Sequence, residues 1–260
     1  MSTRHLPVRP NLDQLKHQAR DLLAALRRGD ADALSDLRAH HPRQVDPAHV
    51  RIADAQHVLA RSYGVASWPR LVLACRMTDA ICRDDLDTVR TLVMRHPRLL
   101  HEDARGVKGN WGPPMSYAAN LGRKRVIEFL RGVGAEDVQF AFERACLQGQ
   151  IDTAMLLHSM GARPVRGSVM GPCETQNAEG LAFLLAHGAE LSDEHGNRLV
   201  PVALVLETYC RNPEGKHRCL EFLAQHGRHR RGVWAFDQEK RPMTAVRKSS
   251  CLREQPSVNQ

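Results

Sequence analysis

Residues 113–136 read P-P-M-S-Y-A-A-N-L-G-R-K-R-V-I-E-F-L-R-G-V-G-A-E, and this stretch decides the fold. Pro114 suits the first position of a helix, where its missing N–H needs no partner. Ala118 and Ala119 are small, so a neighbouring helix can approach closely. Gly122 ends this short first helix. The apolar stripe in the run V-I-E-F-L then predicts a second helix on the other side of the turn.

A similar run of apolar residues at helical spacing, followed by a residue that ends the helix, recurs along the chain. Its closing residues are His96, Gly134, Gly161, Gly188 and Gly227, at intervals of 38, 27, 27 and 39 residues. Two helices and a tight turn fit within 27 residues, and the longer intervals leave room for an extended loop. Self-similarity at such a period predicts a stack of repeated helix pairs.

The stretch 113–136 resembles an ankyrin repeat, whose pattern is T-P-L-H-x-A-A-x-x-G followed by a second helix ending L-L-x-x-G-A-D. Pro113 and Ser116 depart from the pattern, and they remove its Thr–His hydrogen-bond pair. The matching positions are Pro114, Met115, Ala118, Ala119, Gly122, Val126, Leu130, Gly134 and Ala135. The resemblance covers residues 75–227 and is weaker outside 113–136. It implies an all-α, ankyrin-like helical repeat solenoid that presents a binding surface.

Residues 1–74 are helical in pattern but different in kind. Apolar residues recur at helical spacing from Leu12, and Ser67 can cap a further helix that Pro69 opens. The runs L-D-Q-L-K-H-Q-A-R-D-L-L at 12–23 and Y-G-V-A-S-W-P-R-L at 63–71 resemble the N-terminal region of bacterial multi-repeat ankyrin proteins. Because the end repeat of a solenoid exposes an apolar face, we predict a helical N-terminal cap at 1–74 and divergent repeats at 75–227.

The charge of the 260-residue chain is concentrated near its C-terminal end. The net charge is +8, and residues 228–260 hold eight Lys and Arg against three acidic residues. This segment also loses the helical period, so we predict a basic tail that is disordered or loosely attached. One interpretation is a nucleic-acid or other polyanion contact through the tail and Arg123-Lys124-Arg125. The other is a solvated tail without a specific partner.

Catalytic and metal-binding patterns are not found in the sequence. It has no phosphate loop, dinucleotide fingerprint or common hydrolase motif. Fourteen histidines and seven cysteines are present, but Cys210 and Cys219, on either side of Glu214 and His217, match no common zinc spacing. We therefore expect no enzyme, no metal and no cofactor. An enzyme with its site in the 191–218 insertion is the least favoured alternative.

The cysteines and the apolar runs also suggest where the protein resides. An odd number of cysteines without a C-x-x-C motif favours buried, reduced thiols over a disulfide framework. No apolar run approaches the roughly 18 residues that a membrane span needs, and the first ten residues lack a signal-peptide core. We expect a cytoplasmic protein that does not enter a membrane.

The candidate binding residues follow from the repeat architecture. The run R-G-V-K-G-N-W-G at 105–112 predicts a loop, or finger, between two repeats, and loops on rigid scaffolds carry binding. Its Trp111 is an aromatic anchor of the kind that dominates interfaces, although packing across the finger base is the alternative. The variable positions on the first helices are Ser116, Tyr117, Asn120, Glu143, Arg144 and Leu147. We predict that these residues and Trp111 form one exposed surface that binds a protein partner.

Overall fold

The computed structural model describes residues 4–210 and 212–228, and this part of the chain contains helices and no strand. The α-helices are α1 (Leu12–Arg27), α2 (Ala31–His40), α3 (Ile52–Ser62), α4 (Trp68–Cys82), α5 (Leu86–Arg95), α6 (Pro114–Asn120), α7 (Lys124–Gly132), α8 (Val138–Leu147), α9 (Ile151–Ser159), α10 (Met170–Thr175), α11 (Ala178–Ala186), α12 (Leu199–Glu207) and α13 (Pro213–Arg228). Two short 3₁₀-helices lie at Pro47–His49 and Pro97–Leu100.

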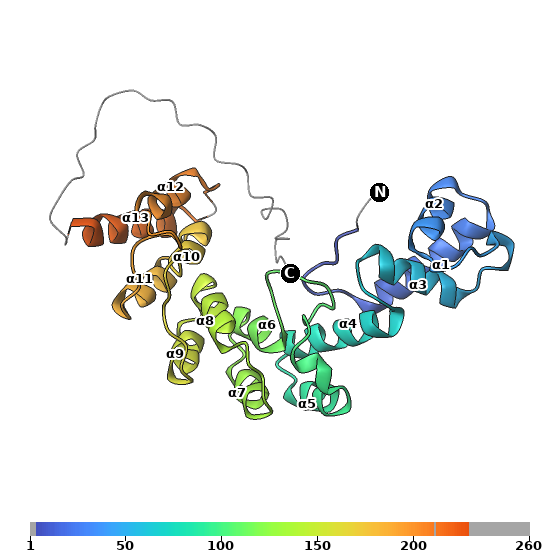
Figure 1. Cartoon of the computed structure of the whole chain (residues 1–260), viewed down its shortest axis with the longest axis horizontal. Helices are drawn as coiled ribbons and strands as arrows, with labels where there is room; N and C mark the ends of the chain where they lie inside the picture. Colours follow the sequence, from blue (N-terminus) through green and yellow to red (C-terminus); the bar gives the residue numbers. More distant parts are fainter. Residues whose placement is uncertain (1–3, 211, 229–260) are drawn as a thin grey trace, which may run out of the picture.

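From α4 onward the helices form pairs that stack side by side. The first helices of the pairs contact one another in the order α4, α6, α8, α10 and α12. Among the second helices, α5 contacts α7, while α11 contacts both α9 and α13. Figure 1 shows the pairs along a curved row, with α4, α6 and α8 toward the concave side and α5, α7 and α9 on the convex side. The described helices form a helical repeat solenoid, which is the architecture expected from the sequence.

The turns inside the four pairs from α4–α5 to α10–α11 have the same geometry even where the residue differs, with positive φ at Asp84, Gly122, Gly149 and Gln176. Gly122 has a φ of +70°, and the N–H of Arg123 after it donates to the carbonyl of Ala118 at 3.0 Å. This six-residue closure satisfies a helix-end carbonyl. Asp84 and Gln176 hold the corresponding place in the α4–α5 and α10–α11 turns, each with a φ of 57°. Residues other than glycine rarely adopt this backbone conformation. The turns therefore share a shape although they do not share a residue type.

The glycines expected to end the second helices behave differently along the array. Gly134, Gly161 and Gly188 all have positive φ, as predicted. Gly227 lies inside α13, which extends to Arg228, so the prediction that it closes the last helix is wrong. The basic tail predicted at 228–260 lies outside the described residues from position 229 onward.

Three helices precede the array. Helix α3 contacts both α1 and α2, and Leu15, Leu26 and Leu59 belong to their shared core. Ser67 occupies the N-cap position of α4, as predicted, although its hydroxyl makes no capping hydrogen bond. The backbone there starts the helix with Pro69 in the first turn instead.

The buried apolar residues form two clusters. The cap cluster extends from Leu6 to Cys75, and the repeat cluster extends from Met77 to Leu223. Ala118 and Ala119 are fully buried in the repeat cluster, so small side chains do allow α4 and α8 to pack closely on α6. A division of the chain into two units at residue 74 stays a prediction.

Candidate interaction surface

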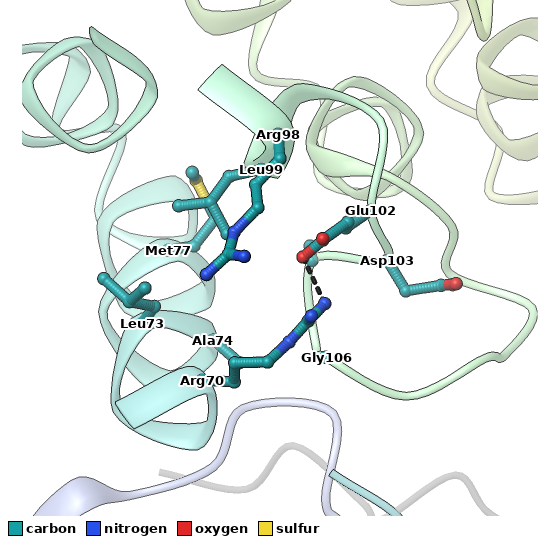
Figure 2. Close-up of a pocket in the computed structure, with 10 residues that line it drawn as sticks. Arg70, Leu73, Ala74, Met77, Arg98, Leu99, Glu102, Asp103 and Gly106 are labelled. Atoms are coloured by element: carbon teal, nitrogen blue, oxygen red, sulfur yellow. Dashed lines mark hydrogen bonds and ion pairs between the residues drawn. The ribbon is translucent and has the colours of Figure 1, made fainter. Parts of the chain in front are cut away.

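The finger (residues 105–112) and the residues on either side of it, 101–104 and 113, pack against α4. Nη2 of Arg70 lies 2.5 Å from Oε2 of Glu102, and Figure 2 shows this ion pair spanning the gap between the helix and the finger. Gly106 has a φ of +72°, and a Cβ there would lie 3.3 Å from the Cβ of Ala74. The pocket enclosed between them has a volume of about 10 Å³, which holds about one water molecule. This pocket is a packing seam and has no room for a substrate.

Trp111 packs across the base of the finger, which is the alternative considered for it. Its ring centroid lies 5.0 Å from that of Tyr117, and it contacts the repeat cluster. Tyr117 is fully buried, and its hydroxyl donates to the carbonyl of Val8 at 3.0 Å. Burial, with a hydrogen bond to Cys82, raises the pKa of Tyr117 well above its usual range. Tyr117 therefore stays neutral and acts as a packed anchor.

Ser116 and Asn120 hold the inner turns of the array together. The backbone N–H of Ser116 donates to Oδ2 of Asp137 at 3.0 Å, and its hydroxyl donates to the same oxygen. Nδ2 of Asn120 donates to the carbonyl of Ser116 at 2.8 Å. The two bonds to Asp137 tie α6 to the loop before α8, whereas the bond from Asn120 stays within α6.

Arg144 continues this network into the next repeat. Its Nε donates to Oδ1 of Asn120 at 2.8 Å, and the residue is 7% exposed. Burial lowers the pKa of Arg144, while the charge of Glu174 on α10 acts in the opposite direction. A charged group held this far from water is costly unless its hydrogen bonds are met. Its hydrogen bond with Asn120 therefore fixes the packing of α8 on α6.

The predicted exposed surface is wrong in its main members. Tyr117 and Arg144 are buried, and so are Ser116 and Asn120, which makes them links between repeats in this conformation. Trp111, Glu143 and Leu147 are half-buried. The structure does bring the set together: the indole of Trp111 lies against the ring of Tyr117, and Asn120 joins Ser116 to Arg144. Their role in binding a partner stays a prediction.

Other apolar side chains are exposed near the starts of the first helices. Phe140 near the start of α8 is 37% exposed, Val165 in the loop before α10 is 48% exposed, and Leu199 at the start of α12 is exposed as well. Phe140 also borders the finger, because a Cβ on Gly112 would lie 2.5 Å from its ring. The signal missed in the sequence is this recurrence of an apolar residue before or near the starts of α8, α10 and α12.

The basic run Arg123-Lys124-Arg125 is largely engaged within the protein. Nη2 of Arg123 donates to the carbonyl of Cys82 at 2.7 Å, which links the α6–α7 turn to the end of α4. Nζ of Lys124 lies 3.4 Å from Oδ2 of Asp152. Arg125 is exposed. Lys124 is exposed as well, so two of the three cations lie on the surface, one of them paired with Asp152, which is a small footprint for a polyanion.

Two further findings bear on the chemistry of the described residues. Within 4–210 and 212–228, no three His, Cys, Asp or Glu side chains come together as a group that could hold a metal ion. Over the same ranges, no helix has the length and apolar character needed to cross a membrane.

Comparison with known proteins gives a likeness in structure and no match in sequence. No protein-family model and no curated protein sequence matches the chain. Among solved structures, the chain is similar to the human ASB11 ankyrin repeat domain, with 17% sequence identity and a TM-score of 0.39. The match covers 77% of this chain and 96% of that one. A likeness at this level identifies neither a family nor a partner.

Proposed function

We propose that the protein is a non-catalytic protein–protein interaction module of the bacterial cytoplasm. In this proposal residues 1–74 cap the array and residues 75–227 present its concave side to a protein partner. The observation that supports it is the unbroken stack of first helices from α4 to α12, which aligns successive loops along one edge. Such aligned edges give repeat proteins extended binding surfaces.

The proposed contact surface is the apolar edge formed by Phe140, Val165 and Leu199, with Trp111 at its border. Exposed apolar side chains that recur along one edge favour burial against another protein. Aromatic side chains such as Phe140 contribute large contact areas at interfaces. This surface replaces the buried Tyr117 and Arg144 as the part of the molecule that a partner can reach.

The experiment is a pull-down from the source cell with mass-spectrometric identification of the captured protein, followed by two matched double variants. The first variant, Phe140→Asp with Val165→Asp, changes the proposed edge. The second, Met94→Asp with Met155→Asp, makes the same chemical change on the second helices α5 and α9, where these residues are 67% and 53% exposed. We expect the first variant to lose the partner and the second to retain it.

If both variants retain the partner equally and keep their helical circular dichroism spectra, this edge is not the contact surface.

Salt dependence tests the polyanion alternative. Binding to nucleic acid should weaken steeply with rising salt, whereas binding through an apolar edge should change little. A steep loss of the captured partner between low and physiological salt would favour the polyanion alternative.

A further inference from the structure

The first part of the chain lies on the inner side of the solenoid. We call residues 4–11 the N-terminal arm. The arm contains no helix, and Figure 1 shows it in dark blue, running beside the green finger before it reaches α1. The hydroxyl of Tyr117 donates to the carbonyl of Val8 at 3.0 Å, and Nη2 of Arg105 donates to the carbonyl of Leu6. Two side chains of the array thus bind alternate carbonyl groups of the arm.

The side chains of the arm alternate as they do in a bound extended peptide. Leu6 and Pro10 are buried and Val8 is half-buried, whereas Pro7 and Arg9 between them are exposed. Leu6 belongs to the cap cluster, and Val8 packs against the repeat cluster. The arm bends at Val8 and Arg9 and has neither helix nor turn on either side of the bend, where Pro7 and Pro10 restrict the backbone to the φ that extended segments adopt. Peptides that bind in extended conformation are recognised in the same way, by main-chain hydrogen bonds and alternate side chains.

Charge pairs hold both ends of the arm. Nη2 of Arg9 lies 2.5 Å from Oδ1 of Asp79 on α4, and its Nε lies 3.1 Å from the same oxygen. Arg83 shares this carboxylate, with its Nη2 3.1 Å from Oδ2. Nη2 of Arg4 lies 2.7 Å from Oδ2 of Asp36 on α2. These pairs are partly exposed, and exposed ion pairs contribute little to stability. These ion pairs determine which residues of the arm lie opposite Asp79 and Asp36, and they add little to the stability of its attachment.

The arm does not fill the space beneath it. Between residues 9–13 and α4 lies a surface pocket of about 590 Å³, which Cys75, Arg76 and Asp79 line from the helix side. Along this stretch the arm is held to α4 by the Arg9–Asp79 ion pair, which is partly exposed.

We propose that Asp79, Arg105 and Tyr117 form a binding site for an extended peptide, and that the N-terminal arm is its intramolecular occupant. The ligand class is read from the arm itself: an extended segment with apolar residues two positions apart, followed directly by arginine, as in Leu6-Pro7-Val8-Arg9. This inference rests on the proposed interaction function and deepens it, because it names the chemistry of one segment that the concave side accepts. A competing segment of this type displaces the arm.

The test uses a fluorescent peptide of residues 4–12 and measures binding by anisotropy. The open-arm variant carries Leu6→Ala, Val8→Asp and Arg9→Ser in the full chain, so that the contacts of the arm with the cap, Tyr117 and Asp79 are all weakened and no charge is introduced at position 9. We expect this variant to bind the peptide at least tenfold more tightly than the unmodified protein, because a tethered arm competes at high effective concentration. Adding Asp79→Arg to the open-arm variant should weaken binding at least tenfold. A peptide in which Arg9 is replaced by aspartate should regain affinity for that charge-reversed protein.

Three results would overturn the proposal. They are no peptide binding by a folded open-arm variant, equal binding by the open and unmodified proteins, or no effect of Asp79→Arg. If the open-arm variant does not fold, hydrogen exchange on the unmodified protein decides the question. Excess peptide must then raise exchange in the arm residues, and unchanged exchange counts against the site. The variants at Phe140 and Val165 test the interaction function separately, so a failed peptide site leaves that result standing.

Discussion

The Nε of Arg144 on α8 donates to Oδ1 of Asn120 on α6 across 2.8 Å, and both residues are buried. The Nδ2 of Asn120 in turn donates to the carbonyl of Ser116 at 2.8 Å. The inner side of the array is therefore held by a polar chain that crosses from one repeat to the next. Polar groups in such a chain depend on each other, because losing one leaves the next unsatisfied in a region of low dielectric.

A double-mutant cycle on Asn120 and Arg144 tests this dependence. Asn120→Ala leaves the buried guanidinium without its hydrogen-bond partner, and Arg144→Met leaves the amide oxygen without its donor. Each single change should lower the free energy of unfolding by about 1–3 kcal/mol. The double variant should lose less than the sum, with a coupling of about 0.5–3 kcal/mol, measured by urea denaturation. Strict additivity would show that the hydrogen bond does not link the two repeats.

The helix pairs were predictable from the sequence because their turns carry a local signal. Gly122 and Gly134 stand where only a residue tolerant of positive φ fits, so the ends of α6 and α7 can be read directly. Asp84 and Gln176 occupy equivalent left-handed turns without being glycine, so the sequence did not reveal those turns. Gly227 gave the opposite error, since a glycine inside α13 looked like a helix end.

The candidate surface was not predictable in the same way. A repeat pattern places Tyr117 on the inner side of a first helix, where an isolated array leaves it open. Its burial depends partly on Val8, which lies 109 positions away and has no periodic relation to it. Arg144 is buried for a similar reason, since its partner comes from the preceding repeat. Contacts between distant segments leave no trace in local periodicity, whereas the exposed position of Phe140 follows from its place near a helix start.

The turn between α6 and α7 should depend on the backbone freedom of Gly122. Alanine at this position, with a φ of +70°, should lower the free energy of unfolding by about 1–2 kcal/mol. Gly132→Ala is the matched change: Gly132 is the last residue of α7, and an added Cβ there meets nothing within 4 Å. It should raise the free energy of unfolding by about 0.4–1 kcal/mol. Urea denaturation measures both, and equal shifts would contradict the turn geometry.

The repeat cluster should respond strongly to the loss of a single leucine. Leu130 on α7 is fully buried, so Leu130→Ala removes apolar contacts and leaves a cavity. It should lower the free energy of unfolding by about 2–5 kcal/mol in urea denaturation. Met155→Ala on α9 is the control, because its exposed side chain should change stability by about 0.5 kcal/mol or less. A small effect at Leu130 would mean that α7 is not part of the stable core.

Buried thiols should make the array sensitive to alkaline pH. Burial, assisted by the charge of Glu143, raises the pKa of Cys146 from 9.0 to about 12. As pH rises, the unfolded chain loses this proton first. The stability that the neutral thiol contributes is therefore fully present below pH 9 and is lost progressively between pH 9 and pH 12.

The decline in the free energy of unfolding caused by one such thiol approaches about 1.4 kcal/mol per pH unit within that window. Cys146→Ala removes the titrating group, so its curve should fall less steeply than that of the unmodified protein between pH 9 and pH 10.5. Urea denaturation at half-unit pH intervals measures both slopes. Parallel curves for Cys146→Ala and the unmodified protein would show that this thiol ionises equally in the folded and unfolded states, and that water reaches the last turn of α8.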